Sequence, residues 1–154
     1  MSDAIASGMT FYTSIYHHGI DDKRRVQIPS KWRPAQPDVE FMLILWPNGA
    51  QPDANILVLP PARMAALATN IQEMSSTDPK AQSLRRLLGA KSAAASLDKS
   101  GRLMLPEDMA KKAGLDKEAI LLGLVDRFEI WNPKRYEIVS QEDASLLSEA
   151  FKLI

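Results

Sequence analysis

Two short segments of the chain place an arginine four residues after an aspartate. The first runs from Asp21 to Arg25 and the second from Asp98 to Arg102. At this spacing the carboxylate can accept hydrogen bonds from the N–H groups of a turn, and the arginine can fold back onto it. The same arginine can instead contact a phosphate or the edge of a guanine in DNA. The residues alone leave a structural clasp and a DNA contact equally open.

Each segment belongs to a longer pattern that occurs twice. The pattern reads apolar, Asp, three residues, Arg, apolar, any residue, apolar, Pro, and it spans residues 20–29 and 97–106. A second similarity, between residues 58–64 and 130–136, follows in the same order. Because both the motifs and their order match, we interpret the chain as two copies of one structural unit.

Both copies predict the same elements around the motif. An extended run precedes the aspartate, over residues 11–20 and 93–97, and a short alternating strand follows the arginine, over residues 26–28 and 103–105. The segment between them is therefore expected to be a tight turn, in which Gly101 is free to adopt positive φ. In the second copy a helix is predicted to open at Pro106 and to end at Gly114.

The remaining elements complete an α+β plan. Further strands are expected over residues 41–46 and 56–59 and over residues 119–125 and 128–131, with the Pro/Gly/Asn-rich segment 47–55 absorbing the difference in length. Helices are predicted to begin at Pro61, Pro79 and Pro133, and the first two should form a helical hairpin. Residues 1–76 then form the first repeat with its trailing helix, 77–92 the inter-repeat helix, and 93–154 the second repeat with a C-terminal helix. Since one such unit is too small to bury both faces of its strands, we expect two pseudo-symmetric β-units packed into one domain.

The composition narrows the function classes. The 154 residues contain 19 basic and 19 acidic side chains and no cysteine, which excludes disulfides, thiolate metal sites and cysteine nucleophiles. No apolar run approaches the roughly 18 residues of a membrane span, and the first ten residues do not resemble a signal peptide, so a cytoplasmic protein is expected. We find no phosphate loop, metal-ligand spacing or catalytic triad, and we predict neither an enzyme nor a cofactor.

A local excess of basic residues surrounds the first motif. Residues 21–33 contain five basic and two acidic side chains, which makes them a candidate patch for DNA phosphates, although a solvated run of charges is the alternative. His17 and His18 lie in a predicted strand, face opposite sides and cannot easily share a metal ion. The tryptophans at positions 32, 46 and 131 lie among apolar residues and are expected in the core or at an interface.

The duplicated pattern with these flanks resembles the MraZ family. Residues 12–23 look like the opening segment of that family, residues 85–90 like its inter-repeat helix, and residues 128–131 like the end of its second repeat. The resemblance covers nearly the whole chain. It implies an AbrB-like swapped-hairpin β fold with two repeats per chain, and a ring-like homo-oligomer. It also implies a nucleoid-associated regulator that binds short direct repeats in double-stranded DNA, upstream of a cell-division and cell-wall gene cluster.

The resemblance also directs the choice of site residues. The residues expected to contact DNA are Lys23, Arg24, Arg25, Lys31, Lys99 and Arg102, while Asp21, Asp98 and Gly101 are expected to shape the turns. One position departs from the family, which usually has glycine where this chain has Arg24. Either the first turn has another shape, or the extra guanidinium is used at the DNA. The alternative function is an oligomeric interaction protein that holds a partner protein without binding DNA.

Overall fold

The architecture of residues 10–36 and 38–154, described by a computed structural model, is a mixed α+β fold built around two antiparallel sheets. A six-stranded sheet has the strand order β1-β7-β8-β4-β3-β5, and a two-stranded sheet pairs β2 with β6. The strands are β1 (Ile15–Gly19), β2 (Arg25–Gln27), β3 (Glu40–Asn48), β4 (Gln51–Leu59), β5 (Ser92–Ser96), β6 (Arg102–Met104), β7 (Glu118–Gly123) and β8 (Phe128–Trp131). The predicted α+β class is confirmed.

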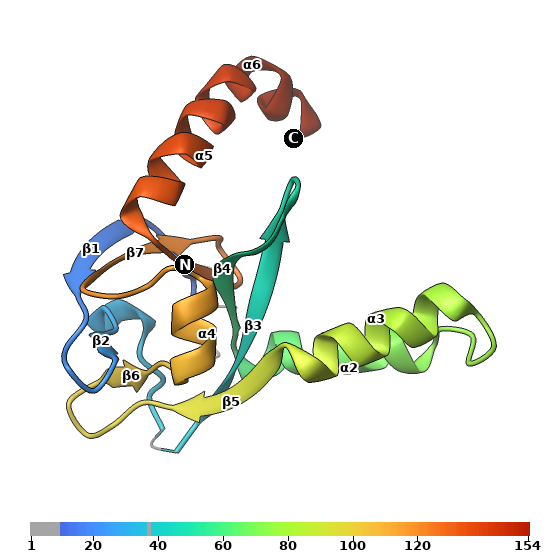
Figure 1. Ribbon diagram of the computed structural model, residues 1–154, viewed down its shortest axis with the longest axis horizontal. Helices are drawn as coiled ribbons and strands as arrows, with labels where there is room; N and C mark the ends of the chain where they lie inside the picture. Colours follow the sequence, from blue (N-terminus) through green and yellow to red (C-terminus); the bar gives the residue numbers. More distant parts are fainter. Residues whose placement is uncertain (1–9, 37) are drawn as a thin grey trace.

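The strands of the two sequence copies interleave (Figure 1). Strand β1, from the first copy, pairs with β7 of the second, and β5 of the second copy pairs with β3 of the first. The short strands that follow the motif arginines also pair across the copies, with Val26 opposite Leu103. Both sheets therefore contain strands from the two copies. Symmetry between the copies as whole units stays a prediction.

Proline and capping residues mark where the helices begin. The helices are α2 (Pro61–Gln72), α3 (Pro79–Ala90), α4 (Glu107–Lys112), α5 (Pro133–Ser145) and α6 (Leu147–Ala150), with two 3₁₀ turns, η1 (Ser30–Trp32) and η2 (Phe151–Leu153). The side chains of Asp78 and Asn132 accept hydrogen bonds from the first N–H groups of α3 and α5. The prediction for α4 was wrong by one residue, because Pro106 caps the helix and Glu107 begins it.

The main core lies between the six-stranded sheet and the β2–β6 pair. Val26 and Leu103 are fully buried there, together with Phe128 and Trp32, whose rings lie 4.9 Å apart. Tyr12 packs edge-on against Trp32 at 5.8 Å. Because both copies contribute to this one cluster, the β2–β6 pair is fixed firmly on its inner side.

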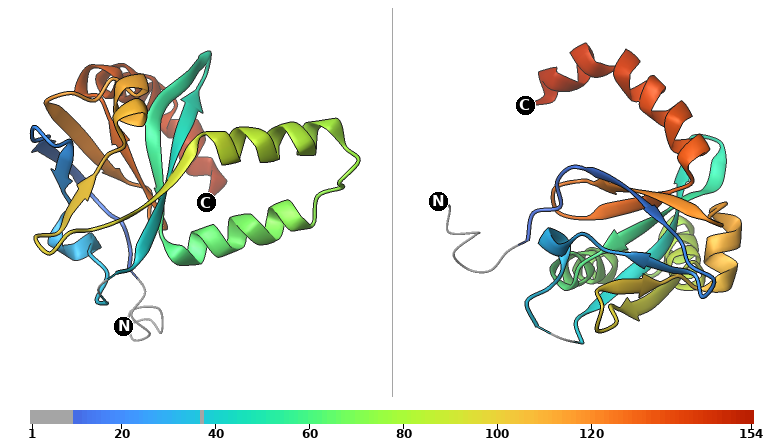
Figure 2. Two further views of the ribbon diagram at one scale, coloured as in Figure 1. Left: turned by 60° about the horizontal axis from the view of Figure 1, so that its bottom comes forward. Right: turned by 90° about the vertical axis from the view of Figure 1, so that its left-hand side faces the viewer.

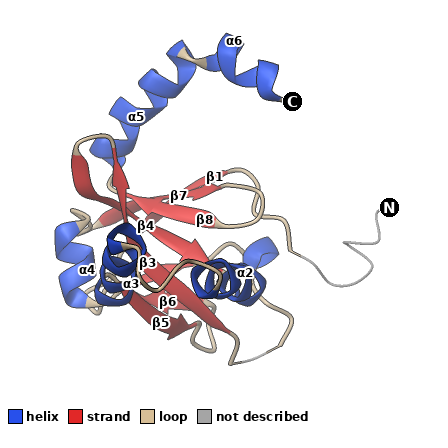
Figure 3. Ribbon diagram, turned by 90° about the vertical axis from the view of Figure 1, so that its right-hand side faces the viewer, coloured by secondary structure: helices blue, strands red, loops and turns tan. Residues whose placement is uncertain are grey.

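The helices α2 and α3 form an antiparallel arm that projects from the sheet, as predicted (Figure 2). Figure 3 shows α2 and α3 next to strands β3 and β4. At the base of the arm, a small second cluster joins Ile44, Leu57 and Leu59 to Met64, Leu67 and Leu88 of the two helices. Near the tip, the Arg85 guanidinium donates hydrogen bonds to the carbonyl oxygens of Ile71 and Met74. The second long projection, α5 with α6, leads away from the sheets to the C-terminus.

The segment over residues 47–55 differs from its prediction as a loop. Strands β3 and β4 continue into it and turn at Gly49, whose φ is +57°, after a shift in register between Trp46 and Asn48. Pro52 fits in this strand because β8 pairs with β4 only from Ile56 onward. Trp46 does not lie in the core, since 36% of its surface is exposed, so its place at an interface stays a prediction, whereas Trp32 and Trp131 are buried as expected. No helix in the described ranges is long and apolar enough to cross a membrane.

Candidate nucleic-acid interface

The first motif forms a closed clasp around its aspartate. The Oδ1 atom of Asp21 accepts hydrogen bonds from the backbone N–H groups of Lys23 (3.0 Å) and Arg25 (2.8 Å). The Oδ2 atom accepts a charge-assisted hydrogen bond from Nε of Arg25 at 2.7 Å. The carboxylate thus shapes the turn with one oxygen and holds the arginine with the other.

The second motif repeats this geometry bond for bond. The Oδ1 atom of Asp98 accepts hydrogen bonds from the N–H groups of Ser100 and Arg102, both at 2.9 Å. Its Oδ2 atom accepts a hydrogen bond from Nε of Arg102, also at 2.9 Å. The structural reading of the motif is therefore correct. The clasp does not exclude a contact with DNA. The aspartate binds Nε of the arginine, and the two Nη groups at the end of the guanidinium extend beyond that atom.

The two turns have the same shape although one has Arg24 where the other has Gly101. Arg24 has a φ of +59° and Gly101 a φ of +78°, and each donates its N–H to the carbonyl of the motif aspartate, at 2.9 and 3.0 Å. A side chain in this left-handed region costs about 1–2 kcal/mol. The suggestion that the first turn has another shape is therefore wrong.

The Arg24 side chain is used within the fold. Its Nε donates a hydrogen bond at 3.1 Å to the carbonyl oxygen of Leu105, at the end of β6. At the corresponding end of β2, Nε of Arg33 donates to the carbonyl oxygen of Ile28 at 3.0 Å. The Arg33 guanidinium lies over Gly101, where a Cβ would come within 2.4 Å of it. Each strand end thus carries one guanidinium, supplied by the turn in one case and by the segment after η1 in the other.

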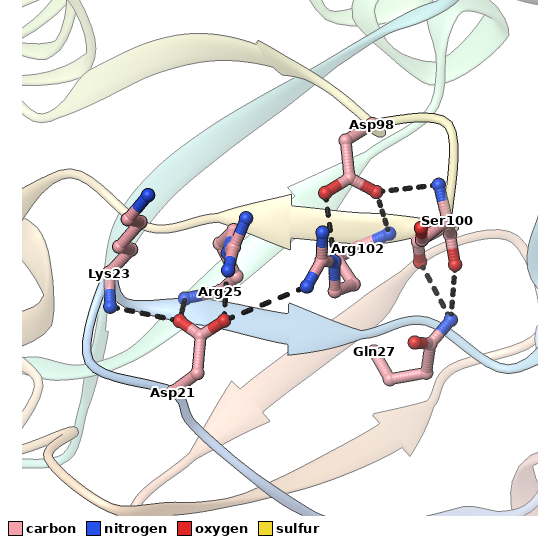
Figure 4. Close-up of polar contacts among 8 residues, drawn as sticks. Asp21, Lys23, Arg25, Gln27, Asp98, Ser100 and Arg102 are labelled. Atoms are coloured by element: carbon pink, nitrogen blue, oxygen red, sulfur yellow. Dashed lines mark hydrogen bonds and ion pairs between the residues drawn. The ribbon is translucent and has the colours of Figure 1, made fainter.

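The outward face of the β2–β6 pair brings the two clasps together (Figure 4). Since Val26 and Leu103 point into the core, strand alternation turns Arg25, Gln27, Arg102 and Met104 outward. Nη1 of Arg102 also lies 3.9 Å from Oδ2 of Asp21, the atom that holds Arg25. Two arginines from distant parts of the sequence are therefore neighbours on one outward-facing, partly exposed strip.

Gln27 belongs to this strip although the sequence analysis did not select it. Its Nε2 donates hydrogen bonds to the carbonyl oxygens of Ser100 at 2.9 Å and of Gly101 at 3.3 Å. The amide therefore braces the second turn from the opposite strand. The available signal was its position two residues after Arg25 in an alternating strand, but its partners lie more than 70 residues away in the sequence.

The predicted lysines divide into two groups. Lys23 and Lys99 are exposed in the two turns, next to the clasps that their neighbours form. Lys31 is exposed as well, but it lies in η1, and within the described part of the chain none of the hydrogen bonds or ion pairs joins it to either turn. The structure therefore brings together all the predicted site residues except Lys31.

The electrostatics of the clasps favour charged aspartates. Hydrogen bonds from the backbone N–H of Arg25 and from its side chain lower the pKa of Asp21, and the bonds that Arg102 donates lower the pKa of Asp98 in the same way. Each arginine is thus held by an ionised partner and fixed in direction. A pre-oriented guanidinium suits a planar acceptor pair, such as a phosphate or the O6 and N7 atoms of guanine.

The described residues contain no group of three metal ligands. As expected from strand alternation, the neighbouring histidines have different partners. Nε2 of His17 lies 3.6 Å from the carboxylate of Glu118, and the ring of His18 stacks on Tyr16 at 6.2 Å.

Comparison with known proteins places the chain in a family. Residues 88–152 match the family described as "MraZ protein, putative antitoxin-like". The chain is similar to the transcriptional regulator MraZ of Thermomicrobium roseum, with 30% identity over 90% of this chain and 96% of the relative. It is also similar to those of Herpetosiphon aurantiacus (33%; 80% and 82%) and Roseiflexus castenholzii (31%; 90% and 93%). The chain therefore belongs to the MraZ family.

Proposed function

We propose that this chain is a transcription regulator, not an enzyme, and that it binds double-stranded DNA with the outward face of β2–β6. Its relatives carry the name transcriptional regulator. The observation that carries the proposal is the pair of aspartate-held arginines, Arg25 and Arg102, side by side on an outward-facing, partly exposed strip. Both guanidiniums lie on the face of the strands that points away from the core.

The strip has the two-stranded architecture and the chemistry that a DNA groove accepts. A two-stranded β-ribbon fits the major groove, where arginine recognises guanine through O6 and N7. In the proposed complex Arg25 and Arg102 reach base edges, while Lys23 and Lys99 at the turns contact the phosphates on either side. Because the net charge of the chain is zero, attraction to DNA depends on this local patch.

We further propose that several copies of the chain act together on short direct repeats, upstream of a cell-division and cell-wall gene cluster. The protein would do so in the cytoplasm. One strip of four outward side chains makes few contacts, so a single site is weak. Linking several sites through one oligomer supplies the effective concentration that makes binding tight. The C-terminal arm supports self-association, since Ile138, Leu146, Leu147 and Phe151 are each more than half exposed.

A second candidate function is the capture of a partner protein without DNA. The observation in its favour is an apolar groove of about 320 Å³ between the β3–β4 hairpin and α3, lined by Trp46, Leu84 and Leu87 among others. The groove is built from other elements than the β2–β6 strip. Binding to DNA that is unaffected by Trp46→Ala, but lost with Arg102→Ala, separates the two functions.

The test is a salt-titrated binding assay on the DNA upstream of the chain's own gene. Specific binding should exceed binding to a shuffled duplex, and the logarithm of the affinity should fall linearly with that of the salt concentration. Footprinting with one repeat deleted, or with the spacing altered, then tests the role of direct repeats. Full affinity for a single repeat contradicts the multivalent arrangement, and equal affinity for the shuffled duplex contradicts sequence-specific regulation.

A further inference from the structure

The outward strip of β2–β6 has two halves, each made of one motif arginine and one neighbouring side chain, and the halves differ in that neighbour. An antiparallel pair of strands is related by a two-fold axis through its central residues, here Val26 and Leu103. The axis relates Arg25 to Arg102, and the aspartates hold these two arginines alike. It also relates Gln27 to Met104, which have nothing in common chemically. The register places Met104 beside Arg25, and Gln27 beside Arg102.

Gln27 presents a hydrogen-bond acceptor in a fixed direction. Its amide nitrogen is bound to the carbonyl oxygens of Ser100 and Gly101, at 2.9 and 3.3 Å. The amide oxygen is turned away from the second turn (Figure 4). With the amide nitrogen placed at the brace, the group that Gln27 offers to a ligand is Oε1, which accepts but does not donate.

Met104 presents an apolar surface at the equivalent place. Half of its surface is exposed, although the flanking residues of β6, Leu103 and Leu105, are fully buried. A thioether cannot brace the first turn as Gln27 braces the second, so the fold makes no use of its exposed end. On a strip otherwise composed of charged and amide groups, this side chain suits a ligand with a methyl group.

We propose, as an extension of the proposed function, that Gln27 and Met104 make the DNA site non-palindromic. Arg102 with Gln27 recognises guanine next to a base that carries an amino group in the major groove, adenine or cytosine. Arg25 with Met104 recognises guanine next to thymine. The two arginines supply the common contact, and their two neighbours supply the difference that gives the bound chain a single direction along the DNA.

The base edges explain this assignment. Adenine N6 and cytosine N4 are donors in the major groove and match the Oε1 acceptor of Gln27, whereas thymine offers an acceptor and a methyl group. The methyl group of thymine makes an apolar contact that suits Met104. A wrong base at either position should lower the affinity about tenfold or more.

The experiment selects binding sites from a random duplex pool with three forms of the full chain. The wild type should select a motif whose two halves differ beside the guanines. In Met104→Gln the new amide can brace the first turn through the carbonyls of Lys23 and Arg24, so both halves become alike and the motif should turn palindromic. Met104→Leu is the matched control and should keep the wild-type motif. Unchanged circular dichroism and melting midpoints verify that each variant is folded.

Competition binding gives the quantitative result. Replacing the thymine by adenine in the selected site should weaken the wild type and Met104→Leu about tenfold, and should not weaken Met104→Gln. A palindromic wild-type motif, or a motif that Met104→Gln leaves unchanged, overturns this inference while DNA binding stands. The absence of any enriched sequence, together with no binding above that of a shuffled duplex, overturns the proposed function and this inference with it.

Discussion

Replacing Gly101 with alanine tests how tightly the second turn is built. At a φ of +78°, any side chain costs about 1–2 kcal/mol. A Cβ there would also lie 2.4 Å from Nε and 2.6 Å from Cζ of Arg33. The guanidinium must therefore move and give up its hydrogen bond to the carbonyl oxygen of Ile28.

The two costs add to a measurable loss of stability. Hydrogen bonds to charged groups contribute about 1.5–3 kcal/mol, and the exposure of Arg33 places this bond at the low end. Gly101→Ala should therefore lower the free energy of unfolding by about 2.5–3.5 kcal/mol. For a chain of this size, that corresponds to a fall in Tm of about 5–15 °C.

Two further variants separate the strain from the clash. Gly49 also has positive φ, at +57°, but a Cβ there meets nothing within 4 Å, so Gly49→Ala should cost only the strain of about 1–2 kcal/mol. In an Arg33→Ala background, Gly101→Ala should cost a similar amount. The assay is denaturant unfolding at one protein concentration. Equal losses for Gly101→Ala and Gly49→Ala, or no coupling between Gly101 and Arg33, would refute the reasoning.

Two other predictions concern the clasps and the assembly. The hydrogen bonds from Arg102 depress the folded-state pKa of Asp98, so the unfolded chain binds the proton more readily. The contribution of Asp98 to the free energy of unfolding is complete at pH values above its pKa in the unfolded chain, about 3.9. It is lost as the pH falls through the lower pKa of the folded state. In Asp98→Asn the free energy of unfolding should therefore fall less steeply as the pH is lowered into the acid range. An NMR titration of the wild type that gives Asp98 a pKa at or above the ordinary aspartate value would contradict this. Light scattering should give an oligomer, since unlike surfaces of one chain associate head to tail and close into rings. A monomer at micromolar concentration would exclude self-association.

Most of the elements could be predicted because local chemistry determines them. Proline at Pro61, Pro79 and Pro133 begins three helices, and Gly114, with a φ of +71°, follows the end of α4. The duplicated motif likewise predicted both turns and the strands after them. The strands over residues 41–46 and 56–59 were predicted, but their continuation into β3 and β4 was not, because the segment 47–55 is rich in proline, glycine and asparagine.

The site was predicted in part because its contacts are of two kinds. The clasps join residues four positions apart, so their spacing was visible in the sequence. The contacts of Gln27 with the second turn and of Arg24 with Leu105 cross from one sequence copy to the other, at separations of 73 and 81 residues. Such contacts depend on which strands pair, and strand pairing follows from burial of the whole core rather than from any local signal.

The central claim is that DNA lies against the strip that carries Arg25 and Arg102. The most direct measurement is the affinity of Arg25→Ala and Arg102→Ala for the selected duplex across a salt titration, with Arg86→Ala as the control. Arg86 is an exposed arginine on α3, so its removal changes the net charge equally at a distant place. Each strip variant should stay folded, and a lost phosphate contact should reduce the salt slope by about one, while a lost base contact should cost about 1–3 kcal/mol and relax specificity at one position. Arg86→Ala should bind as the wild type does. Unchanged affinity in folded Arg25→Ala and Arg102→Ala would contradict the account and leave the arginines as structural clasps alone.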